Sequence, residues 1–256
     1  SNIGIMPPMI TDKIYIQRDL EKIISKNFSK GKIILLYGPR RAGKTTLLKH
    51  LFDDQKIPYL YLNCREKRIQ EMLIPDSLKL KAAIGKHQNI VFDEAQYLQA
   101  PGEVLSVLID AFPKLNLIAS GSSSFELSGK IAEPATGRNL PFYLFPLSYL
   151  ELEKHFPATD LNFYLEQALR FGAYPEIFQY SSPEEKTHYL QILTDDYLYK
   201  DILEFERVKQ SKKLRDLLVA ISLQLGSEVS YSELAGTLSI DRKTVEYFLD
   251  LLEKTY

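Results

Sequence analysis

The chain has 256 residues, of which 45% are apolar and 25% charged, and its 32 basic and 33 acidic side chains leave a net charge of −1. These values are close to the average of globular proteins, so they exclude a disordered chain, a collagen-like repeat and a globally basic nucleic-acid binder. No apolar run reaches the roughly 20 residues that span a membrane, and the lone Cys64 excludes an internal disulfide, so we expect a cytoplasmic protein.

The first part of the chain alternates short apolar runs with helical patterns. An amphipathic helix is expected within residues 10–28, with Leu20, Ile23 and Ile24 on one face. The apolar runs have the length and the flanking residues of buried strands, and they lie at 32–38, 58–63, 89–96, 114–124 and 139–147. Prolines in the last run suit a sheet edge or a strand end. Strands alternating with helices predict an open parallel α/β sheet with right-handed crossovers.

Residues 38–45, GPRRAGKT, match G-x-x-x-x-G-K-[ST] at every position, between an apolar run and a helical pattern. The glycines let backbone N–H groups turn inward at a helix N-terminus, where they bind phosphate. Lys44 is expected to reach the β- and γ-phosphates, and the Thr45 hydroxyl to ligate Mg²⁺. No guanine-reading motif is present, which favours ATP. The predicted nucleotide-binding residues are Gly38, Pro39, Arg40, Arg41, Ala42, Gly43, Lys44, Thr45 and Thr46.

Two carboxylates, Asp93 and Glu94, follow the apolar run that begins at Asn89. We expect Asp93 to hold Mg²⁺ through water and Glu94 to polarise the water that attacks the γ-phosphate. The alternative is a solvated helix cap without a catalytic role. The pair favours hydrolysis over phosphoryl transfer to a small acceptor, for which no acceptor pocket is evident.

Further candidates lie at the end of the fourth run and just before the fifth. Ser120, with Ser122, Ser123 and Ser124, is a candidate contact for the γ-phosphate or the attacking water, or part of a simple serine-rich turn. Arg138 is a candidate cation for the transition state, in its own chain or in a neighbouring protomer. A solvent-exposed arginine is the alternative for Arg138.

From Ser148 onward only helical patterns remain, and residues 231–254 have the spacing of a helix-turn-helix. Ser239 occupies the turn and Asp241 suits the N-cap of the second helix. The expected inner-face residues are Leu234, Ala235, Leu238, Ile240, Val245, Phe248, Leu249 and Leu252. A helix-turn-helix suggests a major-groove reader beginning at Arg242. However, residues 215–256 hold four basic and seven acidic side chains, a net −3 that phosphates repel, so DNA and a protein both remain candidate partners.

The whole chain resembles the prokaryotic AAA-type ATPases, related to the STAND group, that carry a winged-helix segment and often a further nuclease-like domain. The resemblance covers nearly the whole chain in order, and it rests on GPRRAGKTTLL, IVFDEAQ, ASGSSSFEL, TGRNLPFYLFPLSYLEL, FGAYPEIF, YLYKDILE and ELAGTLSIDRKTVEYFLDLLE. It implies a P-loop core with a five-stranded parallel sheet in the order 5-1-4-3-2, a helical lid and a winged helix. It also implies ATP and Mg²⁺, a sensor at Ser120 and Ser122, and Arg138 as a transition-state arginine.

These observations predict three parts: an ATPase core at 1–157, a helical lid at 158–212, and a helix-turn-helix at 213–256 that ends before its wing. The leading hypothesis is a Mg²⁺-dependent ATP hydrolase that acts as a molecular switch and re-aims the helix-turn-helix. A DNA-binding regulator in which the nucleotide is only structural is the alternative. A homo-oligomer is a further expectation, and a membrane partner is not expected.

Overall fold

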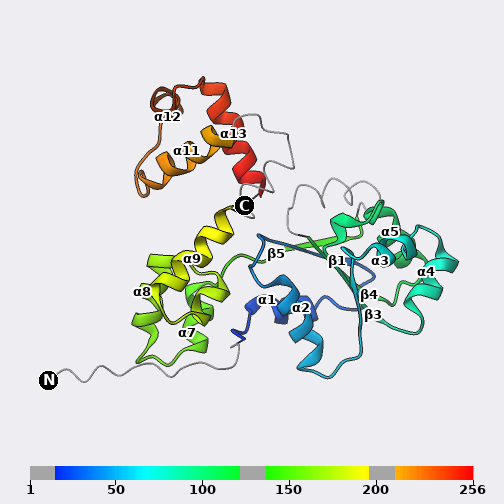
Figure 1. The fold of residues 1–256 in the computed structure, drawn as a ribbon. Helices are drawn as coiled ribbons and strands as arrows, with labels where there is room; N and C mark the ends of the chain where they lie inside the picture. The colour runs from blue at the N-terminus through cyan, green and yellow to red at the C-terminus, as the bar shows by residue number, and fades with distance from the viewer. Residues whose placement is uncertain (1–14, 122–136, 196–210, 256) are drawn as a thin grey trace. The chain divides into compact units, whose positions relative to one another are not determined.

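The computed structural model describes residues 15–121, 137–195 and 211–255. By their internal contacts, the residues divide into two compact units, Ser1–Tyr189 and Leu190–Tyr256 (Figure 1). Within the described ranges, no helix is both long enough and apolar enough to cross a membrane.

The first unit is built on a five-stranded sheet in which every neighbouring pair is parallel. Its strands are β1 (Ile33–Tyr37), β2 (Leu60–Asn63), β3 (Asn89–Asp93), β4 (Asn116–Gly121) and β5 (Asn139–Tyr143). The lateral order is β2-β3-β4-β1-β5, which confirms the predicted order 5-1-4-3-2 read from the other edge. Pro141 lies in the edge strand β5, where its missing N–H costs no ladder bond on the open side.

Helices before and between the strands bury apolar side chains against the sheet. They are α1 (Asp19–Ser25), α2 (Lys44–Asp53), α3 (Lys67–Met72), α4 (Ser77–Ile84) and α5 (Pro101–Ala111), with a 3-10 turn η1 at Ala95–Tyr97. One core cluster joins α1 and α2 to the sheet through Ile24, Leu47 and Phe52, all fully buried. The expectation that Ile23 shares the buried face is wrong, because its side chain is 47% exposed.

After β5 the first unit continues with helices only, as predicted. They are α7 (Tyr149–His155), α8 (Leu161–Phe171), a 3-10 turn η2 (Pro175–Gln179) and α9 (Pro183–Leu193), which reaches the second unit. Ser148 and Glu151 form a capping box at the start of α7. Residues 158–189, the first part of the predicted lid, therefore belong to the same compact unit as the sheet.

The described part of the second unit contains α11 (Ser211–Ser222), α12 (Tyr231–Leu238) and α13 (Arg242–Thr255), packed around one apolar cluster. Between α12 and α13, Ser239 adopts a left-handed φ of 52°, and the Asp241 carboxylate accepts hydrogen bonds from the Thr244 N–H at 2.9 Å and from its hydroxyl. Both fit the predicted helix-turn-helix. Leu251 is fully packed in this cluster, whereas Leu249 and Leu252 are only partly buried.

Candidate nucleotide-binding site

The loop at 38–43 leaves β1 and turns directly into α2. A side chain at Gly38 is impossible, because a Cβ there would lie 2.1 Å from the Leu144 carbonyl oxygen. Gly43 has a φ of 95°, a left-handed conformation that glycine adopts without strain, and it precedes the first residue of α2. The two motif glycines thus serve a close approach and a tight turn onto a helix N-terminus.

Lys44 lies folded back over this loop. Its Nζ donates hydrogen bonds to the carbonyl oxygens of Gly38 at 2.7 Å and Pro39 at 2.9 Å, and the residue is only 6% exposed. Burial lowers the pKa of Lys44 to about 8, although the charges of Glu94 and Asp93 act in the opposite direction. An arriving phosphate would supply the anionic partner that the buried ammonium lacks.

Asp93 is the centre of a hydroxyl cluster at the carboxyl ends of the strands. Its Oδ2 accepts hydrogen bonds from Thr45 Oγ1 at 2.7 Å and from the Tyr61 hydroxyl, and its Oδ1 accepts from the Ser120 hydroxyl. Asp93 is 4% exposed and Ser120 is fully buried. The structure therefore brings together Lys44, Thr45, Asp93 and Ser120.

Glu94 adjoins this cluster with a left-handed φ of 57°. Its N–H donates to Ser120 Oγ at 3.1 Å. Its carboxylate accepts from Arg65 Nη2 at 3.1 Å through Oε1 and from Gln96 Nε2 at 2.5 Å through Oε2. The glutamate is thus held close to Asp93 but points its oxygens toward a different pair of donors.

Sequence reasoning missed Tyr61, Arg65 and Gln96. A signal for two of them was available, because β2 pairs with β3 in parallel and Asn63 lies opposite Asp93. Polar side chains near the end of β2 must then face the carboxylates. Cys64, which lies between Tyr61 and Arg65 in the chain, is fully buried, and burial first, then Asp93 and Glu94, raise its pKa to about 12. A buried thiol with a raised pKa is a poor nucleophile.

The remaining loop residues have different surroundings. Arg41 is exposed, pairs with Glu176 at 2.8 Å and lies over the Tyr189 ring. Ala42 is fully buried, and Thr46 is exposed on α2. Arg40, which directly precedes Arg41, is partly buried.

Arg138 is not brought to the site. It precedes β5 at the opposite end of the sheet, where its carbonyl accepts from the Ile33 N–H and its guanidinium pairs with Asp110 at 3.1 Å. In the register of β1 and β5, Arg138 lies level with Lys32. Six rises of roughly 3.3 Å each separate that level from Gly38, a distance on the order of 20 Å. Ser122, Ser123 and Ser124 lie outside the described residues.

The donor set at Thr45 and Asp93 fits a hard cation. Both side chains offer oxygen atoms, the ligands that Mg²⁺ prefers, and Thr45 Oγ1 lies 2.7 Å from Asp93 Oδ2. An ion held by the hydroxyl would therefore have the carboxylate close enough to reach it through water. In the described ranges no group of three or more His, Cys, Asp or Glu side chains could hold a metal ion. Such sparse protein ligation is usual for Mg²⁺ that is bound together with phosphates.

Comparisons with known proteins give matches to two family models. Residues 30–153 match a family model described as "AAA domain", and residues 162–256 match one described as "Domain of unknown function (DUF8612)". The uncharacterized protein MJ1544 of Methanocaldococcus jannaschii is 28% identical over 268 aligned positions, covering 94% of this chain and 58% of that protein. An uncharacterized protein of Haemophilus influenzae is 26% identical, covering 97% of this chain and 65% of its own length. The chain thus spans less than two thirds of these relatives.

Among solved structures, a Walker-type ATPase of Pyrococcus abyssi is similar, with a TM-score of 0.59, 20% identity, and coverage of 94% of this chain and 90% of that chain. At this identity the likeness supports the fold alone. Together with the sheet order and the family matches, it leads to one conclusion. Residues 30–153 match the AAA domain on a P-loop fold, a match that implies nucleotide binding, and residues 162–256 match a domain of unknown function.

Proposed function

We propose that this protein binds ATP with Mg²⁺, hydrolyses it, and uses the change of nucleotide to re-aim its helix-turn-helix. The observation that carries the proposal is the 2.7 Å contact between Thr45 Oγ1 and Asp93 Oδ2, beside the buried ammonium of Lys44. A hydroxyl, a carboxylate and a cation that meet beside a helix N-terminus are the groups that a metal-bound triphosphate requires.

Each of these side chains has one task in the proposed reaction. Lys44 exchanges its two carbonyl partners for the β- and γ-phosphates, where its charge is better neutralised. Thr45 gives a hydroxyl ligand to Mg²⁺, and Asp93 holds the ion through water. When bound there, the ion would supply positive charge beside the phosphates.

Glu94 orients the attacking water. Each carboxylate oxygen has two acceptor positions, so an oxygen bonded to Arg65 or Gln96 still accepts a hydrogen bond from water. Ser120 connects Asp93 to the Glu94 N–H and is suited to sense the γ-phosphate. Arg138 lies too far from the site of its own chain to act there. A role for it in catalysis would be at the site of a neighbouring protomer, which requires a homo-oligomer.

Calorimetry with ATP, ADP and GTP, with and without Mg²⁺, tests the binding step, and phosphate release tests hydrolysis. Lys44→Ala is expected to weaken ATP binding by about 100-fold or more, because two phosphates lose a charged donor. Lys114→Ala, which removes an exposed lysine far along the chain from the motif, is the matched control. A parent protein that binds none of the three nucleotides would refute the proposal.

The switch is tested separately by hydrogen exchange in α11–α13 with ADP and with ATP. We expect nucleotide-dependent protection in these helices, since a switch requires that the two states differ there. Identical exchange in both nucleotide states would refute the switch and leave only ATP binding and hydrolysis as the proposed function.

A further inference from the structure

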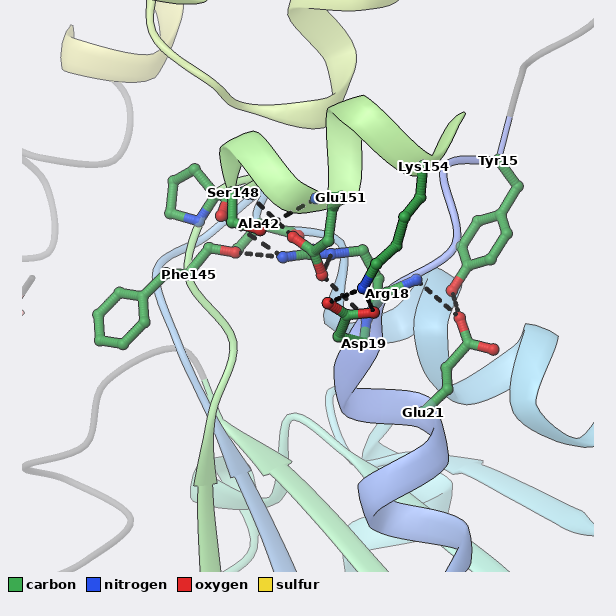
Figure 2. Close-up of polar contacts among 10 residues, drawn as sticks. Tyr15, Arg18, Asp19, Glu21, Ala42, Phe145, Ser148, Glu151 and Lys154 are labelled. Carbon is green, nitrogen blue, oxygen red and sulfur yellow. Dashed lines mark hydrogen bonds and ion pairs between the residues drawn. The ribbon is translucent and has the colours of Figure 1, made fainter. Parts of the chain in front are cut away.

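A buried arginine outside the phosphate-loop motif contacts the loop from the direction of α1. Arg18 immediately precedes α1 and is only 4% exposed. Its Nη1 donates to the Ala42 carbonyl at 2.9 Å, its Nη2 to the Phe145 carbonyl at 2.6 Å, and its Nε to Glu151 Oε1 at 3.0 Å. Figure 2 shows the guanidinium between the phosphate loop, the segment after β5 and α7. One side chain therefore joins three segments to α1.

The bond to Ala42 fixes the direction of a peptide unit in the loop. A trans peptide is planar, so its C=O and N–H point in opposite directions, and the chain has no cis peptide in its described residues. Because the Ala42 carbonyl is turned toward Arg18, the N–H of Gly43 must point away from the guanidinium. A Cβ on Gly43 would lie 3.8 Å from Arg18 Nη1, so the guanidinium lies immediately behind this peptide.

The other partners keep the guanidinium in this place. Glu151 is 6% exposed and also accepts from the Asp19 N–H at 3.0 Å and the Ser148 N–H at 2.9 Å. Burial alone would raise the pKa of Glu151, but the hydrogen bonds from Arg18 and Ser148 outweigh it and hold the pKa below its usual range. The charge of Arg18 is therefore paired, and its rigid fork cannot be reproduced by lysine.

We propose that Arg18 is a positioning residue for phosphate binding, which holds the Ala42–Gly43 peptide so that the Gly43 N–H donates to a nucleotide phosphate. The inference rests on the proposed nucleotide binding and adds a residue that touches the loop but not the ligand. Arg18 acts through one amide of the anion-binding loop. It also links that amide to Glu151, so α7 and the loop are held by the same guanidinium.

The first test compares Arg18→Lys with the parent in the full chain. We expect the Kd and KM for ATP to rise about 10- to 100-fold, the range of one charge-assisted hydrogen bond, while kcat stays within about threefold. Lys154→Met is the matched control, because it removes the exposed Lys154–Asp19 ion pair of the same cluster and leaves the guanidinium contacts intact. The opposite result is an unchanged KM with a kcat that falls in proportion to the fraction of folded protein. It would show that Arg18 has a merely structural role and would overturn the proposal.

The second test needs no variant. Labelling alanine carbonyls with carbon-13 and glycine amides with nitrogen-15 selects the two Ala-Gly pairs of the sequence, 42–43 and 235–236. On addition of ADP we expect a downfield shift of the Gly43 amide proton and a coupling from its nitrogen to phosphorus, while Gly236 stays unchanged as the internal control. If ADP binds and the Gly43 signal does not respond, only this inference fails. If no nucleotide binds the parent, the proposed function fails with it.

Discussion

The two units of the chain differ in what they bury. Every buried polar or charged side chain in the described ranges belongs to the first unit, among them Arg18, Lys44, Asp93 and Ser120. The described cluster of the second unit is wholly apolar. Burying a polar group costs free energy unless it has partners, so a protein retains such groups where they serve a site. The comparison agrees with the proposed ATP site in the first unit, whereas the described part of the second unit has no buried polar group that a site would need.

Glu94→Gln is expected to have the largest effect among the tests of this difference between the two units. The amide keeps the shape of the side chain but cannot accept a proton or hold a negative charge, so phosphate release should fall about 10²- to 10⁴-fold. The Kd for ATP should stay nearly unchanged, since Glu94 has no role in holding phosphate.

Phosphate release and calorimetry on the same preparations measure the two quantities. Glu103→Gln makes the same chemical change on an exposed position of α5 and serves as the control. Hydrolysis at the parent rate in Glu94→Gln would remove Glu94 from the chemistry and leave the buried polar cluster with a binding role only.

A pair of core truncations compares the two units directly. Phe52 is fully buried in the first unit and Phe248 is 2% exposed in the second. Either change to alanine should cost about 3–5 kcal/mol. At roughly 0.05–0.15 kcal/mol per residue, a unit as small as the second holds only a few kcal/mol, so Phe248→Ala should unfold it while the first unit still binds ATP.

Calorimetric melting and hydrogen exchange identify which unit has unfolded. If nucleotide binding changes the state of the second unit, then the state of the second unit must change nucleotide binding by the same free energy. A switch of this kind therefore requires that unfolding the second unit by Phe248→Ala shifts the Kd for ATP about fivefold or more. An identical Kd in the variant and the parent would mean that the units act independently.

The sequence was sufficient for the parts of the first unit that depend on local pattern. The strands follow from the apolar runs, and the meeting of Thr45 with Asp93 follows from motif spacing and the rule that parallel strands end at one edge. The order of the strands came only from the resemblance to AAA-type ATPases. Arg138 was placed by its proximity to β5 in sequence, but it comes before the strand rather than after it. The end of the strand at which a residue stands decides whether it can reach the site.

Contacts between distant segments could not be predicted in this way. Arg18 is separated by 24 residues from Ala42, by 127 from Phe145 and by 133 from Glu151, and no periodicity relates these positions. Tyr61 differs, because the expected strand order already placed β2 beside β3, from which its contact with Asp93 follows. Partners like those of Arg18 depend on tertiary packing, which a single sequence does not reveal.

A smaller effect concerns pH in the first unit. The pKa of Lys44 is lowered to about 8, and bound phosphate needs the ammonium. ATP affinity should therefore fall as pH rises through about 8, at most tenfold per pH unit, and binding above pH 8 should take up a proton. Calorimetry in buffers of different ionisation enthalpy measures this uptake.

The same group affects stability with the opposite sign. Between pH 8 and the usual pKa of 10.5, the unfolded chain holds a proton on Lys44 that the folded chain does not, so this group makes the free energy of unfolding rise with pH. The free energy of unfolding is measured against pH for the parent and for Lys44→Met. The difference between the two profiles isolates the contribution of Lys44. Parallel profiles for the parent and Lys44→Met would show that Lys44 is not titrating in this range.

The smallest effect is expected at the surface of the second unit. Arg242, at the start of α13, pairs with Glu246 at 2.9 Å, and both side chains are exposed. Arg242→Ala removes an exposed pair one helical turn apart, so the free energy of unfolding should change by about 0.5 kcal/mol or less. Denaturant titration of the full chain measures it.

The same variant distinguishes a DNA reader from a protein-binding surface. Arg242 is engaged by Glu246, and Lys213 Nζ donates to the Leu238 carbonyl at 2.5 Å, so two cations of this acidic unit already have protein partners. We therefore expect weak DNA binding in anisotropy titrations at low salt, equal in the parent, Arg242→Ala and the control Lys212→Ala, which removes an exposed cation of α11. Binding that is tight, falls steeply with salt and is lost only in Arg242→Ala would instead make α13 a base-reading helix, because phosphate contacts alone would not single out one cation.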